Sequence, residues 1–171
     1  EGSSEQAVLA GSDSCQSCHT EIHSLWSDSI HGKMIQPATT ATVRGETGEL
    51  ENRTGRKYWR EGRFYIEEDG VEYPVDYTLG NRRVQLYLSR ADSGHINVLH
   101  STWDIRREEW FHSSEFVLRA PEKFRQLWNS TCFYCHVTQH RQDVKGFDAD
   151  TMSFSTEWVE SSASCERCHG P

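Results

Sequence analysis

Three cysteine pairs with the same short spacing stand out in the sequence. They are Cys15/Cys18, Cys132/Cys135 and Cys165/Cys168, and together they use all six cysteines of the chain. A histidine follows each pair at once, and these histidines are His19, His136 and His169. The repeated pattern C-x-x-C-H therefore places two thiols and one imidazole at a fixed spacing, which is typical of a covalent cofactor site.

The chemistry that fits this spacing is the attachment of c-type haem. On one helical turn, residues i, i+3 and i+4 lie on the same face. Two thiols placed in this way can add to the two vinyl groups at one edge of a porphyrin, and the histidine can bind the iron from that side. We therefore predict three covalently bound c-type haems, attached through the six cysteines, with His19, His136 and His169 as iron ligands.

Zinc sites and redox dithiols are the alternatives to haem. A structural zinc site needs four ligands, and the gap from Cys135 to Cys165 is longer than the usual spacing in zinc ribbons. A redox dithiol does not need the histidine that follows each pair. Both alternatives therefore explain the three motifs less well than haem does.

The other histidines are candidates for the second ligand of each iron, and they are His23, His31, His95, His100, His112 and His140. His31 follows the first motif closely, and His112 comes directly after two aromatic residues whose rings could wall a porphyrin. We expect His31 and His112 to be distal iron ligands. His23 and His140 each lie four residues after a proximal histidine, so either could reach only a neighbouring haem.

Composition limits the class of protein. Only 35% of the 171 residues are hydrophobic, so the polypeptide alone supplies a thin core and needs a stabilising cofactor. The net charge of -8 argues against a nucleic-acid partner, which favours a basic face. No stretch has the apolar length of a transmembrane segment. The polar start at Glu1 is what we expect of a mature exported chain after removal of a signal peptide.

The segments between the motifs predict an α+β fold. Short aromatic or β-branched runs indicate strands at Lys57–Arg60, Arg63–Glu68, Val71–Tyr77, Arg82–Ser89 and Ile96–Thr102. The pairs Glu61-Gly62 and Asp69-Gly70 between the first three runs favour tight hairpins. Helices are expected at Ser14–Trp26, after good N-cap residues, and at Glu122–Trp128, after a proline.

These elements predict a single multihaem domain over residues 1–171. It would contain a first haem segment at 13–36, a β-rich insertion at 50–104, and a segment for the second and third haems at 120–171. The fold is thus expected to have short haem-binding helices on both sides of a small antiparallel β-rich insertion, organised around covalently bound haems.

Several connecting segments form a pattern of their own between the motifs. They are Gly11-Ser12, Trp26-x-x-Ser29-x-His31, Gln36-Pro37-Ala38, Tyr77-Thr78-x-Gly80, Gln85-x-Tyr87-Leu88, Trp103-Asp104, Trp110-Phe111-His112, Trp128-Asn129 and Cys168-His169-Gly170-Pro171. From about Gly11 to Pro171 the chain resembles the multihaem c-type cytochrome module often found upstream of tetratricopeptide repeats in exported bacterial proteins. The resemblance implies haem ligation by the histidines at 31 and 112. Because that family usually continues past Cys-His-Gly-Pro, it also implies a larger chain with downstream repeats, or an oligomer.

Three functions follow as hypotheses. The leading one is an electron carrier that relays single electrons between redox protein partners through closely spaced, mainly bis-His haems. The second is a multihaem oxidoreductase with one open haem that acts on a small nitrogen or oxygen compound. The third is a structural or filament module built on stacked haems. The resemblance implies a periplasmic or extracellular location, and the acidic chain favours a redox partner with a basic docking face.

Overall fold

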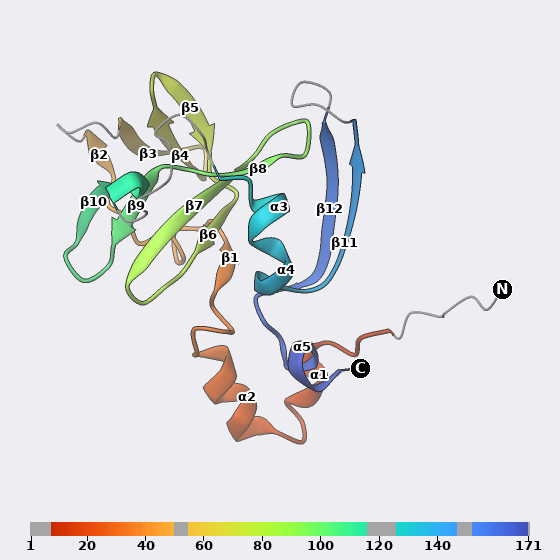
Figure 1. The fold of residues 1–171 in the computed structure, drawn as a ribbon. Helices are drawn as coiled ribbons and strands as arrows, with labels where there is room; N and C mark the ends of the chain where they lie inside the picture. Colours follow the sequence, from red (N-terminus) through yellow and green to blue (C-terminus); the bar gives the residue numbers. More distant parts are fainter. Residues whose placement is uncertain (1–7, 50–54, 116–125, 147–151, 171) are drawn as a thin grey trace.

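The middle of the chain is antiparallel sheet, and the short helices that carry the cysteine motifs lie below and to one side of it (Figure 1). The computed structural model describes residues 8–49, 55–115, 126–146 and 152–170. The mixture of few helices with antiparallel sheets confirms the predicted α+β class.

A four-stranded sheet contains the two predicted hairpins. Its strands are β2 (Gly48–Glu49), β3 (Arg56–Arg60), β4 (Arg63–Glu68) and β5 (Val71–Pro74), paired in chain order. Both residues of each turn have positive φ: 50° and 77° at Glu61 and Gly62, and 53° and 75° at Asp69 and Gly70. A type I′ turn requires this conformation at both central positions, so the hairpin signals in the sequence are confirmed.

A second, larger sheet packs beside the first. It has the order β1 (Ile35–Pro37), β6 (Tyr77–Leu79), β7 (Val84–Arg90), β9 (Ser101–Asp104) and β10 (Glu109–His112), with β8 (Ile96–Val98) also paired to β7. The expected runs Val71–Tyr77 and Ile96–Thr102 are each divided between two strands. The sheet also reaches beyond the expected insertion of 50–104, because β1 precedes it and β10 follows it.

A third, two-stranded ribbon was not expected from the sequence. It consists of β11 (Val137–Lys145) and β12 (Ser153–Ser161), which pair antiparallel between the second and third cysteine motifs. His140 therefore lies on a strand, opposite Trp158, although its spacing of four residues from His136 had been interpreted with helical geometry.

The helices of the described residues are short and lie within the cysteine motifs or directly beside them. They are α1 (Ser12–Cys15), α2 (Thr20–Ser27), α3 (Trp128–Thr131), α4 (Phe133–His136) and α5 (Cys165–His169), with one 3₁₀ turn, η1, at Ser113–Glu115. The single helix expected over Ser14–Trp26 is divided in two, because His19 leaves the helical region at φ -121° and ψ 42°. Of the helix expected over Glu122–Trp128, residues 122–125 lie outside the described residues. Leu127 is extended and forms an isolated bridge with Asn97.

Two clusters of buried side chains hold these layers together. One cluster joins β4, β7 and β9 through residues such as Phe64, Tyr87 and Trp103. The other joins the larger sheet to α3 and α4, and its members are Ile35, Leu79, Leu88, Ile96, Val98, Trp128, Phe133 and Val137. The second motif is thus fixed to the sheet by its own core residues, whereas the first and third motifs lie outside both clusters.

Candidate haem-binding site

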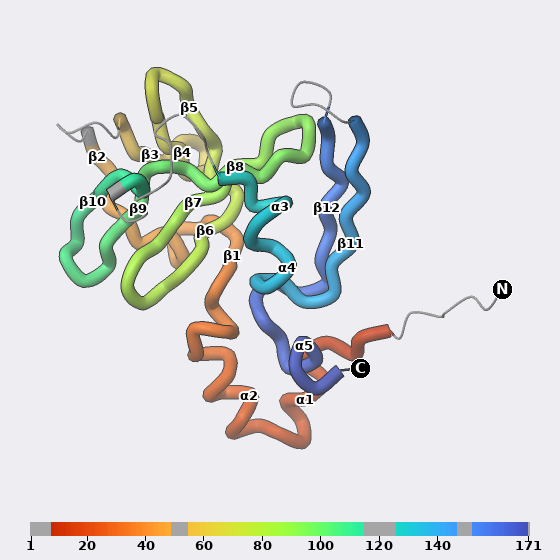
Figure 2. The backbone as a smooth tube through the Cα atoms, viewed as in Figure 1, coloured from red at the N-terminus to blue at the C-terminus, as the bar shows by residue number. Residues whose placement is uncertain are grey.

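The structure brings the first motif (Cys15–His19) and the third motif (Cys165–His169) together. The helices α1 and α5 contact each other, although about 150 residues separate them in the chain (Figure 2). A hollow of about 490 Å³ lies between the two motifs, and it is lined by Cys15, His19, Ile22, His23, Cys165, Glu166, His169 and Gly170. One cysteine and the histidine of each of these two motifs therefore face the same space.

The second cysteine of each motif is more exposed than the first. The first cysteines are partly buried, and the exposed second cysteines are Cys18, Cys135 and Cys168. Cys18 and Cys168 are not among the residues that line the hollow. Within this fold, the hollow is therefore faced by one thiol of each of these two motifs, and not by both thiols as the helical spacing predicts.

Cys18 departs from the sequence analysis in its secondary structure as well. The expected helix over Ser14–Trp26 would contain Cys18, but α1 ends at Cys15 and Cys18 lies in the turn before α2. That placement was wrong, because the backbone leaves the helical region at His19. Sγ of Cys18 accepts a hydrogen bond from the hydroxyl of Ser17 at 3.8 Å. The N–H of His19 still bonds to the carbonyl of Cys15 at 2.9 Å, and haem attachment through Cys18 stays a prediction.

Hydrogen bonds to two carboxylates fix the junction of the first and third motifs. The carboxylate of Glu166 accepts hydrogen bonds from the backbone N–H groups of Ala10 and Gly11, at 2.9 and 2.8 Å. The carboxylate of Glu160 accepts from the N–H and the hydroxyl of Ser12, at 2.9 and 3.3 Å. The segment just before the first motif is therefore bound to β12 and to the third motif.

The loop that contains His31 is attached to the same region. The carbonyl of His31 accepts a hydrogen bond from the N–H of Ala163 at 3.3 Å. The indole N–H of Trp26, on α2, donates to the carbonyl of Ala163 at 2.9 Å. Ala163 lies two residues before Cys165, so the structure brings His31 next to the third motif, with its side chain exposed.

His23 lies in the hollow between the first and third motifs. Its side chain is buried, and Nε2 makes no hydrogen bond among the described residues. The nearest carboxylate is that of Asp13, 3.8 Å from Nε2, which is too far for a hydrogen bond. A buried, unpaired imidazole nitrogen is costly, so its presence indicates that a further group contacts this side of the hollow.

The second motif (Cys132–His136) is anchored by buried residues on α3 and α4. Trp128 and Phe133 are fully buried, and the side chain of Asn129 joins α3 to neighbouring segments. Asn129 Oδ1 accepts from the N–H of Ile96 at 2.6 Å, and Nδ2 donates to Thr156 Oγ1 on β12 at 2.7 Å. These contacts fix the helices that carry the second motif against β8 and β12.

Burial alters the acidity of the second motif. It lowers the pKa of His136, so the imidazole stays neutral down to a lower pH. The neutral imidazole is the form that binds metal. Burial also raises the pKa of the Cys132 thiol, although a hydrogen bond with Thr131 acts in the opposite direction. The guanidinium of Arg167 donates to the carbonyl of Tyr134, so the second and third motifs are also in contact.

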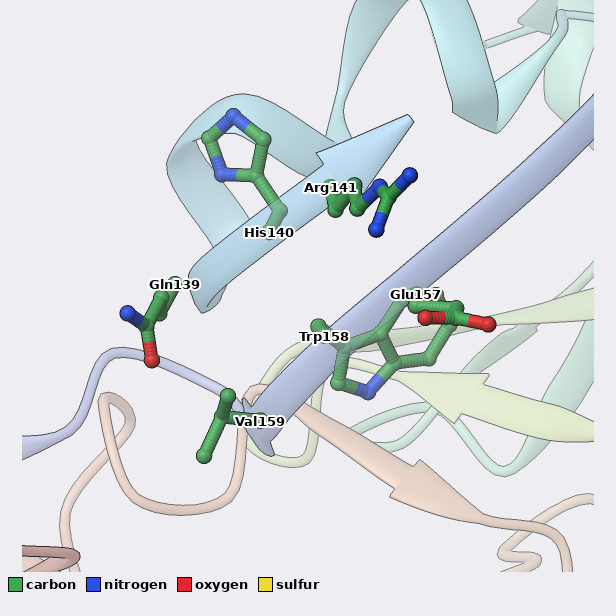
Figure 3. A pocket seen from close by; sticks show the side chains of 6 residues that line it. All are labelled: Gln139, His140, Arg141, Glu157, Trp158 and Val159. Carbon is green, nitrogen blue, oxygen red and sulfur yellow. The ribbon is translucent and has the colours of Figure 1, made fainter. Parts of the chain in front are cut away.

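A smaller hollow, of about 350 Å³, lies at the base of the β11–β12 ribbon (Figure 3). It is lined by Gln139, His140, Arg141, Glu157, Trp158 and Val159, none of which belongs to a cysteine motif. The ring of His140 packs edge-on against Phe133 and Tyr134, and its Nδ1 is buried without a partner among the described residues. Burial and the nearby charge of Arg167 lower the pKa of His140.

His112 lies far from the three motifs. It is on β10, at the opposite side of the sheets from α1 and α5 (Figure 1). Its ring stacks on that of His100 with 4.7 Å between the centroids. Nδ1 of His112 bonds to the hydroxyl of Ser114 at 2.6 Å. The structure therefore groups the two histidines with each other, and not with a described cysteine motif.

The residues around the larger hollow fit a covalently bound porphyrin. All six cysteines are free thiols, so none is used in a disulfide. Ile22 and Leu25 on α2 have exposed fractions of 66% and 68%, and Ile22 lines the hollow. Exposed apolar side chains beside two proximal histidines and an unpaired imidazole are the surroundings that a flat, largely apolar cofactor would cover.

Several residues that position the motifs were not found from the sequence. Besides Asn129, Glu160 and Glu166, they include Ser162, whose hydroxyl bonds to both the N–H and the carbonyl of Ile35 at 3.0 Å. The sequence contains no local signal for these contacts, because each joins a common polar residue to a segment far away in the chain. For Asn129 a weak signal was present, since it belongs to the Trp128-Asn129 pair that precedes the second motif.

Comparison with known proteins agrees with this geometry. Residues 95–170 match the protein family described as cytochrome c554 and c-prime. No curated protein sequence matches the chain. Among solved structures, the outer cell wall cytochrome OcwA has the same fold, with a TM-score of 0.60 and 21% sequence identity. The match covers 95% of this chain and 32% of OcwA, so the chain spans about a third of the length of that cytochrome.

Two of the three C-x-x-C-H motifs lie inside the stretch that matches the cytochrome family, and the fold match covers nearly the whole chain. The first and third motifs face one hollow that fits a porphyrin. The motifs, the fold and the family match over residues 95–170 point to the same class: the chain is similar to multihaem c-type cytochromes.

Proposed function

We propose that this chain holds three covalently attached haems and relays single electrons between redox partners through them. The haem iron supplies the redox chemistry, because it accepts and releases one electron without making or breaking a bond to a substrate. The polypeptide has three tasks in such a relay. It attaches the haems, sets their spacing and supplies axial ligands.

The observation that carries this proposal is the hollow shared by the first and third motifs. Because Cys15 and Cys165 line the same space, porphyrins attached there would be close neighbours. The contact from Arg167 to the carbonyl of Tyr134 then connects the third motif to the second. This arrangement supports a relay in which the third haem lies between the other two.

His31 and His112 are the proposed distal ligands. For His31, the hydrogen bond between its carbonyl and Ala163 supports ligation of the third haem, because Ala163 lies just before Cys165. For His112, Nδ1 bonds to the hydroxyl of Ser114 and also accepts the backbone N–H of Ser114 at 3.2 Å, so these bonds do not single out Nε2 for iron and the assignment stays the prediction made from the sequence.

We also propose an exported location and a basic redox partner. The structural relative is described as an outer cell wall cytochrome, which supports export of this chain to the periplasm or the cell exterior. None of the helices in the described ranges has the length and hydrophobicity needed to cross a membrane. The net charge of -8 favours a partner with a positively charged docking face.

The stoichiometry of the holoprotein tests the trihaem proposal. Intact mass should exceed that of the polypeptide by three haems, and thiol titration of the denatured protein should find no free cysteine. A matched variant with Cys132→Ala and Cys135→Ala should lose one haem and keep two. A mass with two haems, together with a disulfide in the remaining pair, would contradict the proposal.

A further inference from the structure

We propose that Glu166 is a positioning residue that holds the first motif against the third and so sets the spacing of two haems. The inference rests on the proposed function, because it concerns the same relay. Glu166 is one of the two residues between the attachment cysteines of the third motif. Any group bound to its carboxylate is therefore tied directly to that attachment site.

The contacts of Glu166 are bidentate and reach across the chain. Each carboxylate oxygen accepts one backbone N–H, from Ala10 at 2.9 Å and from Gly11 at 2.8 Å. Gly11 takes a φ of 83°, a conformation that favours glycine, and in it two successive N–H groups bond to one carboxylate. The first attachment cysteine, Cys15, follows only four residues later.

Other bonds at this junction are of a different kind. Ser12 donates both its N–H and its hydroxyl to Glu160, and its hydroxyl oxygen also accepts from the N–H of Cys165 at 3.3 Å. A hydroxyl can rotate and act as donor or acceptor, whereas a backbone N–H can only donate. Glu166 faces two backbone donors. Its carboxylate therefore cannot be replaced by an amide without the loss of one hydrogen bond.

This difference makes the glutamine variants informative. In Glu166→Gln, one side-chain oxygen remains as an acceptor. The new NH₂ group faces a backbone N–H, and because both groups are donors they cannot form a hydrogen bond. One of the two N–H groups loses its partner. In Glu160→Gln, the hydroxyl of Ser12 can accept from the new NH₂ group, so both bonds can be kept. The exposed Glu157, on β12, provides a control for the change in charge alone.

The experiment uses the holoprotein and two readouts. Hydrogen exchange at the amides of Ala10 and Gly11 reports the hydrogen bonds themselves. Circular dichroism in the Soret region reports the coupling between neighbouring haems, which depends on their distance and angle. We expect Glu166→Gln to keep the wild-type haem content, to exchange about tenfold faster at one of these amides, and to lose much of the Soret couplet. Glu160→Gln and Glu157→Gln should match the wild type.

Each result decides one of the two proposals. Unchanged exchange and an unchanged couplet in Glu166→Gln would overturn the positioning role. Equal losses in Glu157→Gln would also overturn it, because charge alone would then explain the effect. If the wild type has no couplet, or lacks a haem at the first or third motif, the proposed relay between these motifs is wrong. The amide exchange would still show whether Glu166 holds the segment in place.

Discussion

At the scale of single residues, each C-x-x-C-H motif provides two thiols and one imidazole within five residues. Of the two cysteines in the first and third motifs, only the first lines the shared hollow together with the histidine, so local spacing did not predict where Cys18 and Cys168 lie. The carbonyl of His31 bonds to Ala163, two residues before the third motif, and ligation of iron by His31 stays a prediction. The carboxylates of Glu160 and Glu166 could not be predicted, because their partners are backbone amides about 150 residues away.

The distal ligands give a prediction at this scale. We expect His31→Ala and His112→Ala each to turn one six-coordinate low-spin haem into a high-spin haem that binds carbon monoxide, because the iron loses its second imidazole. Absorption and electron paramagnetic resonance spectra of the ferric holoprotein measure the change, which should affect about one haem of the three proposed.

The control for these variants is His95→Ala. His95 bonds to Ser93 at 2.6 Å and packs edge-on against Phe154, so it has a structural explanation within the protein. Its replacement should leave the spin state unchanged. If neither His31→Ala nor His112→Ala changes the spin state, the distal assignments are wrong, and His23, with its unpaired buried Nε2, becomes the next candidate.

At the scale of elements, the hairpins were predictable and the ribbon was missed. The turns Glu61-Gly62 and Asp69-Gly70 require positive φ at both residues. A glycine after an acidic residue favours this conformation, so the turns could be predicted. In β12, the aromatic or β-branched residues Phe154, Thr156 and Trp158 alternate with Ser155 and Glu157. That alternation is a strand signal, but no strand was predicted between the second and third haem motifs.

The helix predicted over Ser14–Trp26 is divided into α1 and α2. Good N-cap residues predicted one helix over Ser14–Trp26, yet Cys18 lies in a turn and the backbone leaves the helix at His19. Local propensity is a weak guide where tertiary contacts decide the backbone path. Here α1 packs against α5, while Trp26 on α2 bonds to Ala163, so each half of the predicted helix has its own long-range anchor.

Gly94 provides a prediction on how the ribbon is held to the larger sheet. It has a φ of 81°, and a Cβ at this position would lie only 1.8 Å from the carbonyl oxygen of Phe154 on β12. Gly94→Ala combines an unfavourable backbone conformation with overpacking, so we expect it to lower the free energy of unfolding by about 3 kcal/mol. Denaturant unfolding of the holoprotein measures this loss.

Gly62→Ala is the matched control for the backbone term. Gly62 has a similar φ of 77°, but the space around its Cβ position is open. The control should therefore lose only the conformational part, about 1 kcal/mol. Equal losses in the two variants would show that close packing of the β7–β8 turn on β12 contributes little to stability.

At the scale of the whole molecule, the main role of the sheets and their cores is to position the three cysteine motifs relative to one another. The sheets and their cores fix the second motif through Trp128 and Phe133, and hydrogen bonds then join the other two motifs to its neighbourhood. A thin hydrophobic core is compatible with this design, because covalent haems would supply apolar surface in the remaining space. An electron carrier and an open-haem oxidoreductase share such a framework, so the two hypotheses must be separated by activity.

The last prediction separates them by what the reduced holoprotein does. We expect it to pass electrons rapidly to a basic acceptor protein, and to turn over nitrite, hydroxylamine or peroxide slowly. The net charge of -8, to which the haem propionates add, attracts a basic partner over long range at low salt. Raising the ionic strength from about 0.01 M to 0.15 M shortens the Debye length from about 30 Å to 8 Å, so the bimolecular rate should fall by about tenfold.

An acidic acceptor of similar potential is the control, and its rate should rise or stay constant over the same range. Stopped-flow spectroscopy of haem oxidation measures all of these rates. Fast turnover of a small molecule, with slow and salt-independent exchange to both acceptors, would show that the protein is an oxidoreductase with an open haem.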